Sequence, residues 1–365
     1  MLDRCSLCGC LQCRSIYSVE GLPVFQNVVF DTRDNAINTR KANVDLVQCT
    51  DCGFVFNRLF NSDELVYSDQ YQNEQGYSFA FRDHLNKMVR FVGEKLSFDA
   101  RIVEIGCGKG LFLELLKDSG FEGALGYDPA YEGSNDAITK GYFSEECSNI
   151  GADLIVLRHV LEHMEDPLGF LNTIARTNQF KGNILIEVPD LEWIMNKKAF
   201  WDVYYEHCNY FTTETLGALF RTSEIQKVFN DQYLCLTAKL SDLRKIVLSG
   251  YRGDCPSIPF KTRIDELNTT LSAKETNIVW GGSSKGVTLL NIIDKDRKKV
   301  EFLIDINPKK QGKFIGGTGH QILPPDFLKK LAGEDVCIII TNENYCDEIV
   351  REISRFALNP NFVML

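Results

Sequence analysis

Residues 101–110 constrain the fold of this chain more than any other segment. They read Arg-Ile-Val-Glu-Ile-Gly-Cys-Gly-Lys-Gly, a short apolar run that ends in a glycine-rich turn. An apolar segment with helical character, 111–117, follows directly. A strand, a tight turn and a helix in this order leave bare backbone at a helix N-terminus, where a ligand can approach closely. We therefore expect a ligand site here, on the first strand of a parallel α/β sheet.

An acidic residue at the end of the next apolar run narrows the choice of ligand. The carboxylate of Asp128 can accept hydrogen bonds from two ribose hydroxyls, and a dinucleotide-binding unit is one interpretation. However, Glu-x-Gly-x-Gly-x-Gly with this acidic residue resembles the S-adenosylmethionine (SAM) site of class I methyltransferases. The cofactor-binding residues that this resemblance implies are Glu104, Gly106, Cys107, Gly108, Gly110 and Asp128, with Arg158 and His159 lining the same face.

The apolar pattern divides the 365 residues into three parts, at 1–70, 71–238 and 239–365. The first part is rich in cysteine and turn residues, and the other two alternate strand-like and helical runs. We expect an α/β fold with a class I SAM methyltransferase (Rossmann-like) core, a small N-terminal zinc-binding domain and a second Rossmann-like C-terminal domain. Expected strands lie at 101–105, 122–127, 153–158, 182–188, 276–280, 301–305 and 335–340, and expected helical segments at 71–98, 240–248 and 262–272, with Phe79 on the apolar face of the first.

Charge and hydropathy exclude two classes of partner. The net charge of −10 argues against a nucleic-acid surface, which needs clustered Lys and Arg. No run of about 18 apolar residues is present, and the N-terminal residues do not resemble a signal peptide. We expect a cytoplasmic protein with no membrane partner, and the sequence leaves open whether it is a monomer or a dimer.

Six of the thirteen cysteines fall within the first 52 residues. In a reducing compartment such a cluster indicates metal binding rather than disulfides. Two Cys-x-x-Cys-Gly patterns, at 5–9 and 49–53, match each other, whereas the competing pair at 10–13 is followed by Arg14 instead of Gly. Four thiolates form a closed tetrahedral site that is structural rather than catalytic. The zinc ligands that we expect are Cys5, Cys8, Cys49 and Cys52.

The order of these parts resembles the nucleotide-sugar C-methyltransferases that build branched-chain deoxysugars. Segment 204–211, Tyr-Tyr-Glu-His-Cys-Asn-Tyr-Phe, is similar to the family's Tyr-x-Glu-His-x-x-Tyr-Phe signature. Segment 305–313 resembles its Asp-x-Asn-Pro-x-Lys-Gln-Gly element, and Pro23 with Asn27 resembles an element between the zinc pairs. The resemblance implies a SAM-dependent enzyme that methylates a nucleotide-linked keto-deoxysugar, with the C-terminal domain contributing to binding of the nucleotide sugar.

Methylation of a carbon requires a base, because the carbon must first lose a proton. Loss of a proton is feasible only next to a carbonyl, and C3 of a 4-keto sugar is such a carbon. His207 is the expected base, with Glu206 to orient it and Tyr204 as a hydrogen-bond donor or proton relay. His159 and His163 lie on neighbouring loops, where we expect His159 to line the SAM or substrate face. If His207 is not the base, Tyr204 and then His159 are the alternatives. A sugar O-methyltransferase on the same scaffold and a non-catalytic zinc/Rossmann binding protein are the alternative functions.

Overall fold

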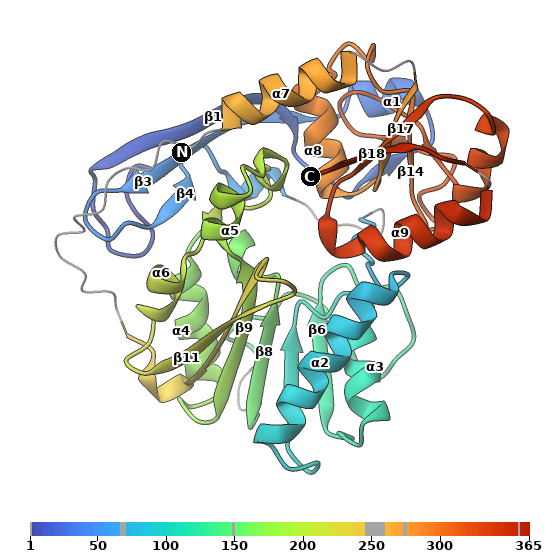
Figure 1. Ribbon diagram of the computed structural model, residues 1–365. Coiled ribbons are helices and arrows are strands. Elements are labelled where there is room, and N and C mark those ends of the chain that lie inside the picture. The colour runs from blue at the N-terminus through green and yellow to red at the C-terminus, as the bar shows by residue number, and fades with distance from the viewer. Residues whose placement is uncertain (1, 66–70, 148–149, 245–259, 273–275, 357) are drawn as a thin grey trace.

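The structure is a computed structural model that describes residues 2–65, 71–147, 150–244, 260–272, 276–356 and 358–365. Three sheets of four or more strands organise these residues. In Figure 1 the seven-stranded sheet lies below, and the N-terminal and C-terminal sheets lie side by side above it. Within the described ranges, no helix is both long enough and apolar enough to cross a membrane.

The seven-stranded sheet has the order β11-β12-β9-β8-β5-β6-β7. Strands β9, β8, β5, β6 and β7 are parallel, β12 is antiparallel to β9, and β11 is antiparallel to β12. The expected strands at 101–105, 122–127, 153–158 and 182–188 are confirmed, with ends that differ by one or two residues. The strands are β5 (Ile102–Ile105), β6 (Ala124–Asp128), β7 (Ile138–Lys140), β8 (Leu154–Arg158), β9 (Asn183–Pro189), β11 (Ser223–Val228) and β12 (Tyr233–Lys239).

Helices pack on this sheet through apolar stripes, as their sequence periods predict. In α2 the buried residues Phe81, Leu85, Met88 and Val92 repeat at helical spacing, but Phe79 is 74% exposed, so its expected place on that face is wrong. Two residues of α-helix turn the chain by about 200°, and Phe79 therefore points away from the side on which Phe81 lies. The helices of this part are α2 (Phe79–Lys95), α3 (Leu111–Asp118), α4 (Pro167–Thr177), α5 (Leu191–Asn196) and α6 (Thr213–Gly217).

The N-terminal sheet has the order β1-β3-β4-β10, and its last strand comes from far along the chain. Asn209 and Tyr210, inside the 204–211 segment, pair with Phe56 and Val55. The N-terminal sheet therefore holds the segment that was expected to carry catalysis. The elements of this region are β1 (Cys13–Pro23), β2 (Val29–Phe30), α1 (Arg33–Ile37), β3 (Lys41–Cys49), β4 (Val55–Asn57) and β10 (Asn209–Tyr210).

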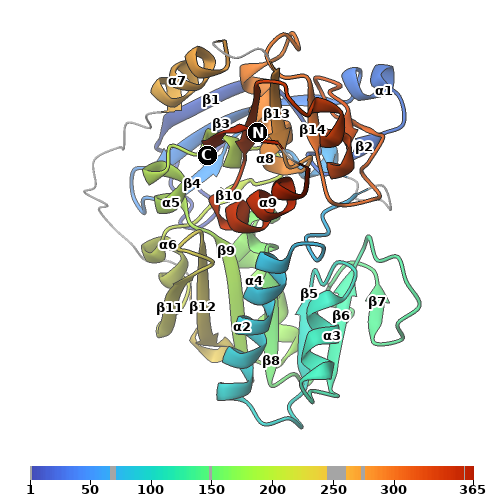
Figure 2. The same ribbon diagram turned by 45° about the vertical axis from the view of Figure 1, so that its right-hand side comes forward.

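The C-terminal sheet is parallel throughout, in the order β16-β14-β13-β17-β18. The expected strands at 276–280, 301–305 and 335–340 are confirmed within this sheet. The helical segment expected at 262–272 lies within α7, which crosses over β1 in Figures 1 and 2, where the rings of Tyr17 and Phe260 are 4.8 Å apart. The elements are α7 (Phe260–Ser272), β13 (Thr276–Trp280), α8 (Ser284–Ile293), β14 (Phe302–Ile304), β15 (Phe314–Ile315), β16 (Ile322–Leu323), β17 (Val336–Ile340), α9 (Cys346–Ile353) and β18 (Asn361–Met364).

Strand β15 of the C-terminal part pairs with β2 of the N-terminal part. The helical segment expected at 240–248 begins as a 3₁₀ turn, Leu240–Asp242, and the rest of it from residue 245 lies outside the described residues.

Candidate functional site

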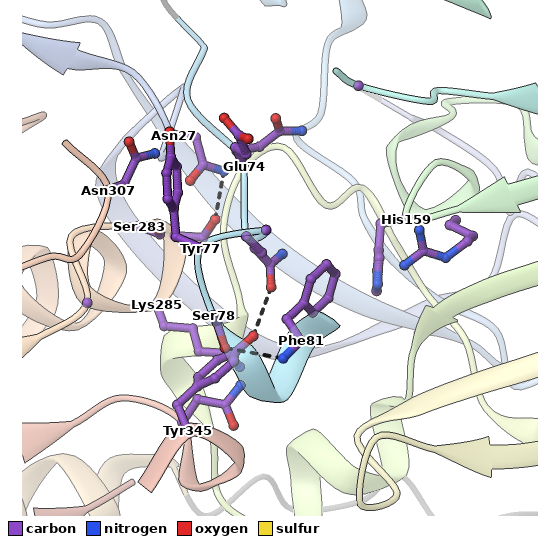
Figure 3. A pocket seen from close by; sticks show the side chains of 18 of the residues that line it. Asn27, Glu74, Tyr77, Ser78, Phe81, His159, Ser283, Lys285, Asn307 and Tyr345 are labelled. Carbon is purple, nitrogen blue, oxygen red and sulfur yellow. Dashed lines mark hydrogen bonds between the residues drawn. The ribbon is translucent and has the colours of Figure 1, made fainter. Parts of the chain in front are cut away.

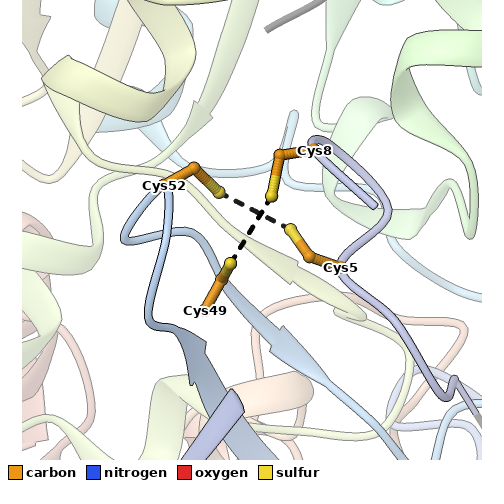
Figure 4. A group of neighbouring side chains, drawn as sticks. All are labelled: Cys5, Cys8, Cys49 and Cys52. Atoms are coloured by element: carbon orange, nitrogen blue, oxygen red, sulfur yellow. Dashed lines mark hydrogen bonds between the residues drawn. The ribbon is translucent and has the colours of Figure 1, made fainter. Parts of the chain in front are cut away.

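Four cysteine side chains meet at one end of the N-terminal sheet (Figure 4). The sulfur atoms of Cys5 and Cys52 are 3.6 Å apart, those of Cys8 and Cys49 are 3.5 Å apart, and all four lie within 4.8 Å of one another. Tetrahedral zinc with Zn–S bonds of about 2.3 Å separates its sulfur ligands by about 3.8 Å. The geometry fits a four-thiolate metal ion, and the cluster is made of the predicted quartet without the pair at 10–13.

Glycines at both knuckles explain how short loops aim two sulfurs at one point. Gly9 and Gly53 have positive φ angles of 80° and 74°, and each donates its backbone N–H to the carbonyl of the first cysteine of its pair. Left-handed backbone of this kind strains residues other than glycine. Arg14 follows the competing pair, inside strand β1, and that pair lies outside the cluster.

The first glycine-rich turn lies at the carboxyl end of β5. Gly106, Gly108 and Gly110 have φ angles of 76°, 57° and 87°. A Cβ atom on Gly106 would lie 2.3 Å from Cγ2 of Val160, whereas one on Gly108 would meet no heavy atom within 4 Å. The turn therefore packs tightly on its protein side and leaves open space above Gly108, as a cofactor lying against the backbone requires.

Asp128 anchors this turn from the end of β6. Its two carboxylate oxygens accept hydrogen bonds from the backbone N–H groups of Gly108 and Ala130, each at 2.8 Å. Each oxygen keeps a further lone pair, so the geometry is compatible with bonds to two ribose hydroxyls. Burial raises the pKa of Asp128, and these two N–H groups lower it.

A buried carboxylate that the sequence reasoning missed organises the floor beside this turn. Glu187 of β9 is fully buried and contacts three side chains: Nε2 of His84 at 3.0 Å, Nη2 of Arg158 at 3.3 Å and Nε2 of His159 at 3.2 Å. Burial alone would raise the pKa of Glu187, but Arg158 and the two imidazoles hold it well below its usual range. A charged residue inside the apolar run 184–188 was the available signal, because such strands are normally apolar on both faces.

Burial and the contacts with neighbouring charged groups also shift the pKa values of Glu104 and His159. Burial raises the pKa of Glu104 to about 7, although the Arg158 guanidinium, 3.7 Å away, lowers it. Burial lowers the pKa of His159, but hydrogen bonds to Glu162 and Glu187 outweigh it and raise the value to about 9. Arg158 and His159 thus present positive charge to the floor of the cofactor site.

The predicted catalytic segment brings two of its three residues together. The Tyr204 hydroxyl lies 2.8 Å from Nε2 of His207, and both side chains are buried. Burial, with His163 next, holds the pKa of His207 well below its usual range. Glu206 points elsewhere: its carboxylate accepts a hydrogen bond of 2.8 Å from the backbone N–H of Gln26. The structure therefore links Glu206 to the N-terminal module and pairs His207 with Tyr204.

The second glycine-rich turn, 281–286, is anchored by a carboxylate in the same way as the first. The carboxylate of Asp305 accepts hydrogen bonds from the backbone N–H groups of Gly282 and Asn307, each at 2.8 Å. Nδ2 of Asn27 reaches the same turn and donates to the Ser284 hydroxyl at 3.0 Å. The N-terminal element around Asn27, noted in the sequence, therefore meets the C-terminal part at this turn.

One cavity of about 340 Å³ connects these features (Figure 3). Segment 73–78, between the N-terminal module and α2, lines one side, and the C-terminal part supplies another through Lys285 and Tyr345. The Tyr345 hydroxyl donates to the Gln75 side chain at 2.9 Å. Burial lowers the pKa of Lys285, which pairs with Asp202.

Most of the predicted site residues line this cavity. They are Glu104, Gly106, Cys107, Gly108, Arg158, His159, Tyr204 and His207. Gly110 instead caps α3, the Asp128 carboxylate accepts a hydrogen bond from the backbone N–H of the turn, and Glu206 accepts one from the backbone N–H of Gln26. The structure thus joins both glycine-rich turns and the Tyr204–His207 pair in one space.

Two family matches agree with this arrangement. Residues 71–227 match a family described as a methyltransferase domain, and residues 260–364 match the C-methyltransferase C-terminal domain. The chain is a SAM-dependent methyltransferase. Its core therefore has the class I Rossmann-like fold that the glycine-rich turn predicted.

Individual relatives are distant. The chain is 23% identical over 400 residues to the C-methyltransferase NovU of Streptomyces niveus, which covers 98% of this chain and 94% of the relative. It is 21% identical to the structure of a SAM-dependent methyltransferase from Archaeoglobus fulgidus, covering 43% of this chain and 94% of that one, with a TM-score of 0.33. It is 16% identical to the structure of 1,6-didemethyltoxoflavin-N1-methyltransferase of Burkholderia thailandensis. That match covers 44% of this chain and 78% of the other, with a TM-score of 0.32.

Proposed function

We propose that this methyltransferase methylates the carbon next to the ketone of a nucleotide-linked keto-deoxysugar, C3 of a 4-keto sugar, with His207 as the base. The observation that supports this most strongly is the Tyr204–His207 pair, which lines the same cavity as both glycine-rich turns. SAM, when bound against the first turn, supplies the methyl group. The match to a C-methyltransferase C-terminal domain supports a carbon acceptor.

His207 is unprotonated at neutral pH. Because burial holds its pKa well below the usual range, the imidazole is neutral and offers a lone pair. Burial also raises the pKa of Tyr204 well above its usual range, so the phenol keeps its proton and can donate a hydrogen bond to a developing enolate oxygen. The pair therefore supplies the base and the donor that carbon deprotonation needs.

The nucleotide half of the substrate is assigned to the second turn. Backbone N–H groups at the N-terminus of α8 favour an anion, and Asp305 keeps lone pairs on both oxygens beyond its two backbone bonds. Asn27 contacts the turn from the N-terminal part of the chain, and Lys285 of the turn itself lines the cavity. A nucleotide held here would place its sugar in the cavity beside His207.

We assign a single structural zinc ion to Cys5, Cys8, Cys49 and Cys52. The cluster packs against the apolar core that also contains Phe54 and Phe211. Metal binding energy becomes folding energy in such a site. Zinc would therefore stabilise the sheet that holds the 204–211 segment, without taking part in methyl transfer.

Keto-sugar nucleotides incubated with SAM provide the test, with product mass and the methylated atom as readouts. We expect a methyl group on carbon, and a methyl group on oxygen would instead support the O-methyltransferase alternative. Solvent deuterium exchange at the substrate carbon, run without SAM, isolates the base. His207→Asn should lower turnover by roughly 10²–10⁴ and abolish exchange while SAM still binds.

Two further variants sharpen this test. His320→Asn removes an equally buried imidazole that lies outside the cavity lining, and it controls for the general effect of losing a buried ring. Tyr204→Phe separates direct proton abstraction from a relay through the phenol, since a relay requires the hydroxyl. Exchange at the wild-type rate in His207→Asn would show that His207 is not the base.

A further inference from the structure

A second group of metal-ligating side chains lies beside the Tyr204–His207 pair, far along the sequence from the cysteines. Ligand atoms of Glu162, His163 and His207 all lie within 4.8 Å of one another. The rings of His163 and His207 meet edge to face, with centroids 4.8 Å apart. Both imidazoles line the cavity, so a ligand could reach the group from that side.

Hydrogen bonds to backbone carbonyl groups hold the two chain segments of this cluster together. The N–H of Cys208 donates to the carbonyl of Glu162 at 2.9 Å, and Nδ2 of Asn209 donates to the carbonyl of Leu161 at 3.3 Å. The neighbouring residue His207 is therefore held next to the 3₁₀ turn Leu161–His163 before any ligand arrives. Such preorganisation is what a metal site needs from its scaffold.

One oxygen of the buried Glu162 carboxylate lacks a hydrogen-bond partner among the described residues. The side chain is 1% exposed, and its Oε1 lies 3.3 Å from Nδ1 of His159. Its Oε2 is buried and has no hydrogen-bond partner among the residues that the structure describes. A buried carboxylate oxygen without a partner is costly, and a cation at this point would offset that cost.

We propose that Glu162, His163 and His207 form a second metal site, which takes a divalent transition metal such as Zn²⁺ or Co²⁺. Two imidazoles and one carboxylate suit these ions better than Mg²⁺ or Ca²⁺, which prefer oxygen ligands. Ligand atoms around one zinc ion lie about 3.4 Å apart, so small side-chain rotations close the group on the metal. Three protein ligands leave a coordination position open toward the cavity.

Neighbouring residues support the ligands in the way that metal sites usually require. When the Tyr204 hydroxyl accepts a hydrogen bond from Nε2–H of His207, the lone pair of Nδ1 is left for a metal. His159 occupies the other oxygen of Glu162. The cluster therefore has both ligands and the outer hydrogen bonds that orient them.

Metal at this site acts as a reversible inhibitor, a consequence that rests on the proposed role of His207. A bound ion takes up the lone pair with which His207 would accept the substrate proton. Loosely bound Zn²⁺ or Co²⁺ should thus suppress solvent deuterium exchange at the substrate carbon, and a chelator should restore it.

Equilibrium dialysis of the full-length, zinc-loaded protein against Co²⁺ tests the site itself. We expect two metal ions per chain in the wild type and one in His163→Asn and Glu162→Gln, with affinity at the second site lowered about tenfold or more. Co²⁺ in the second site should show visible d–d absorption without the near-ultraviolet band of a cobalt–thiolate bond. His320→Asn should keep both ions.

The variants keep the proposal open to refutation even if one of them is unstable. Retention of one zinc ion and a cooperative thermal transition show that a variant is folded, and two different ligands are tested. One metal ion per chain in the wild type, or a second ion retained in both variants, would overturn the proposal. A second ion that binds to a wild type which never exchanges deuterium would leave the site standing and refute the role of His207 as base.

Discussion

Replacing Glu187 with Gln should destabilise the methyltransferase core strongly, although the two side chains are nearly the same size. Glu187 is fully buried and faces Arg158 at 3.3 Å, His159 at 3.2 Å and His84 at 3.0 Å. The variant leaves these groups in the same low-dielectric setting without their shared carboxylate. Removing one member of a buried ion pair costs about 3–5 kcal/mol, because the remaining charge is uncompensated.

The structure places the expected loss at the lower end of that range. His159 keeps Glu162 at 3.3 Å, and Arg158 keeps Glu104 at 3.7 Å, which is charged above its pKa of about 7, so above that pH each cation retains one carboxylate. We expect a loss of about 3 kcal/mol. At roughly 2–4 °C per kcal/mol, the thermal midpoint should fall by about 6–12 °C.

The pH dependence of this difference identifies its cause. The pKa of His159 is raised from 6.5 to about 9 in the folded protein, so the stability from its protonated form is fully present below pH 6.5 and is lost as the pH rises through about 9. The gap between wild type and Glu187→Gln should therefore be widest near pH 6.5 and should narrow toward pH 10. Arg158 stays charged throughout, so part of the gap should remain.

Calorimetry of the zinc-loaded, SAM-free protein at several pH values measures this. Glu192→Gln is the matched control, since that carboxylate is 48% exposed and pairs with Lys227 on the surface, where such pairs contribute about 0–1 kcal/mol. A midpoint for Glu187→Gln within about 2 °C of the wild type would refute the reasoning, given the expected scale per kcal/mol. So would a gap that does not change with pH.

Three other substitutions test the cofactor turn and the metal cluster. Asp128→Ala should weaken SAM binding by about 1.5–3 kcal/mol, measured by titration calorimetry, because it removes a charged hydrogen-bond acceptor; unchanged affinity would place SAM elsewhere. Cys49→Ser should lose the metal from the N-terminal cluster, measured by elemental analysis, while Cys10→Ser should keep it, since Cys10 lies outside the cluster. The reverse pattern would show that the wrong quartet was assigned. Gly106→Ala should lower both the melting temperature and SAM affinity, because its Cβ would lie 2.3 Å from Val160 and its φ angle is 76°. Gly141→Ala, with no heavy atom within 4 Å of the added Cβ, is its control, and equal behaviour of the two variants would contradict the packing argument.

Local patterns predicted the elements that depend on neighbouring residues. The glycine spacing at 106–110 gives three left-handed residues in one turn. The sequence pointed to Asp128 as a ribose ligand, and the structure adds that its carboxylate accepts a hydrogen bond from the backbone of that turn. Phe79 was placed on the buried face of α2 because it is apolar. It lies two residues before the buried Phe81, which puts it on the opposite, exposed side of the helix. The sequence analysis missed Glu187, although a single charged residue inside an apolar strand indicates that a partner of opposite charge lies nearby. The sequence does not show which distant residue that partner is.

The sequence by itself determined the pieces of this protein: the paired cysteine knuckles, the two strand–turn–helix units, and the Tyr204–His207 spacing that puts both side chains within reach. Only the tertiary structure decided which distant segments contact one another. Strand β10 joins the N-terminal sheet, Glu206 bonds to Gln26, and Asn27 reaches Ser284 across more than 250 residues of chain. Those contacts depend on how whole sheets pack around one cavity, and no local periodicity encodes which distant backbone group will satisfy a buried carboxylate.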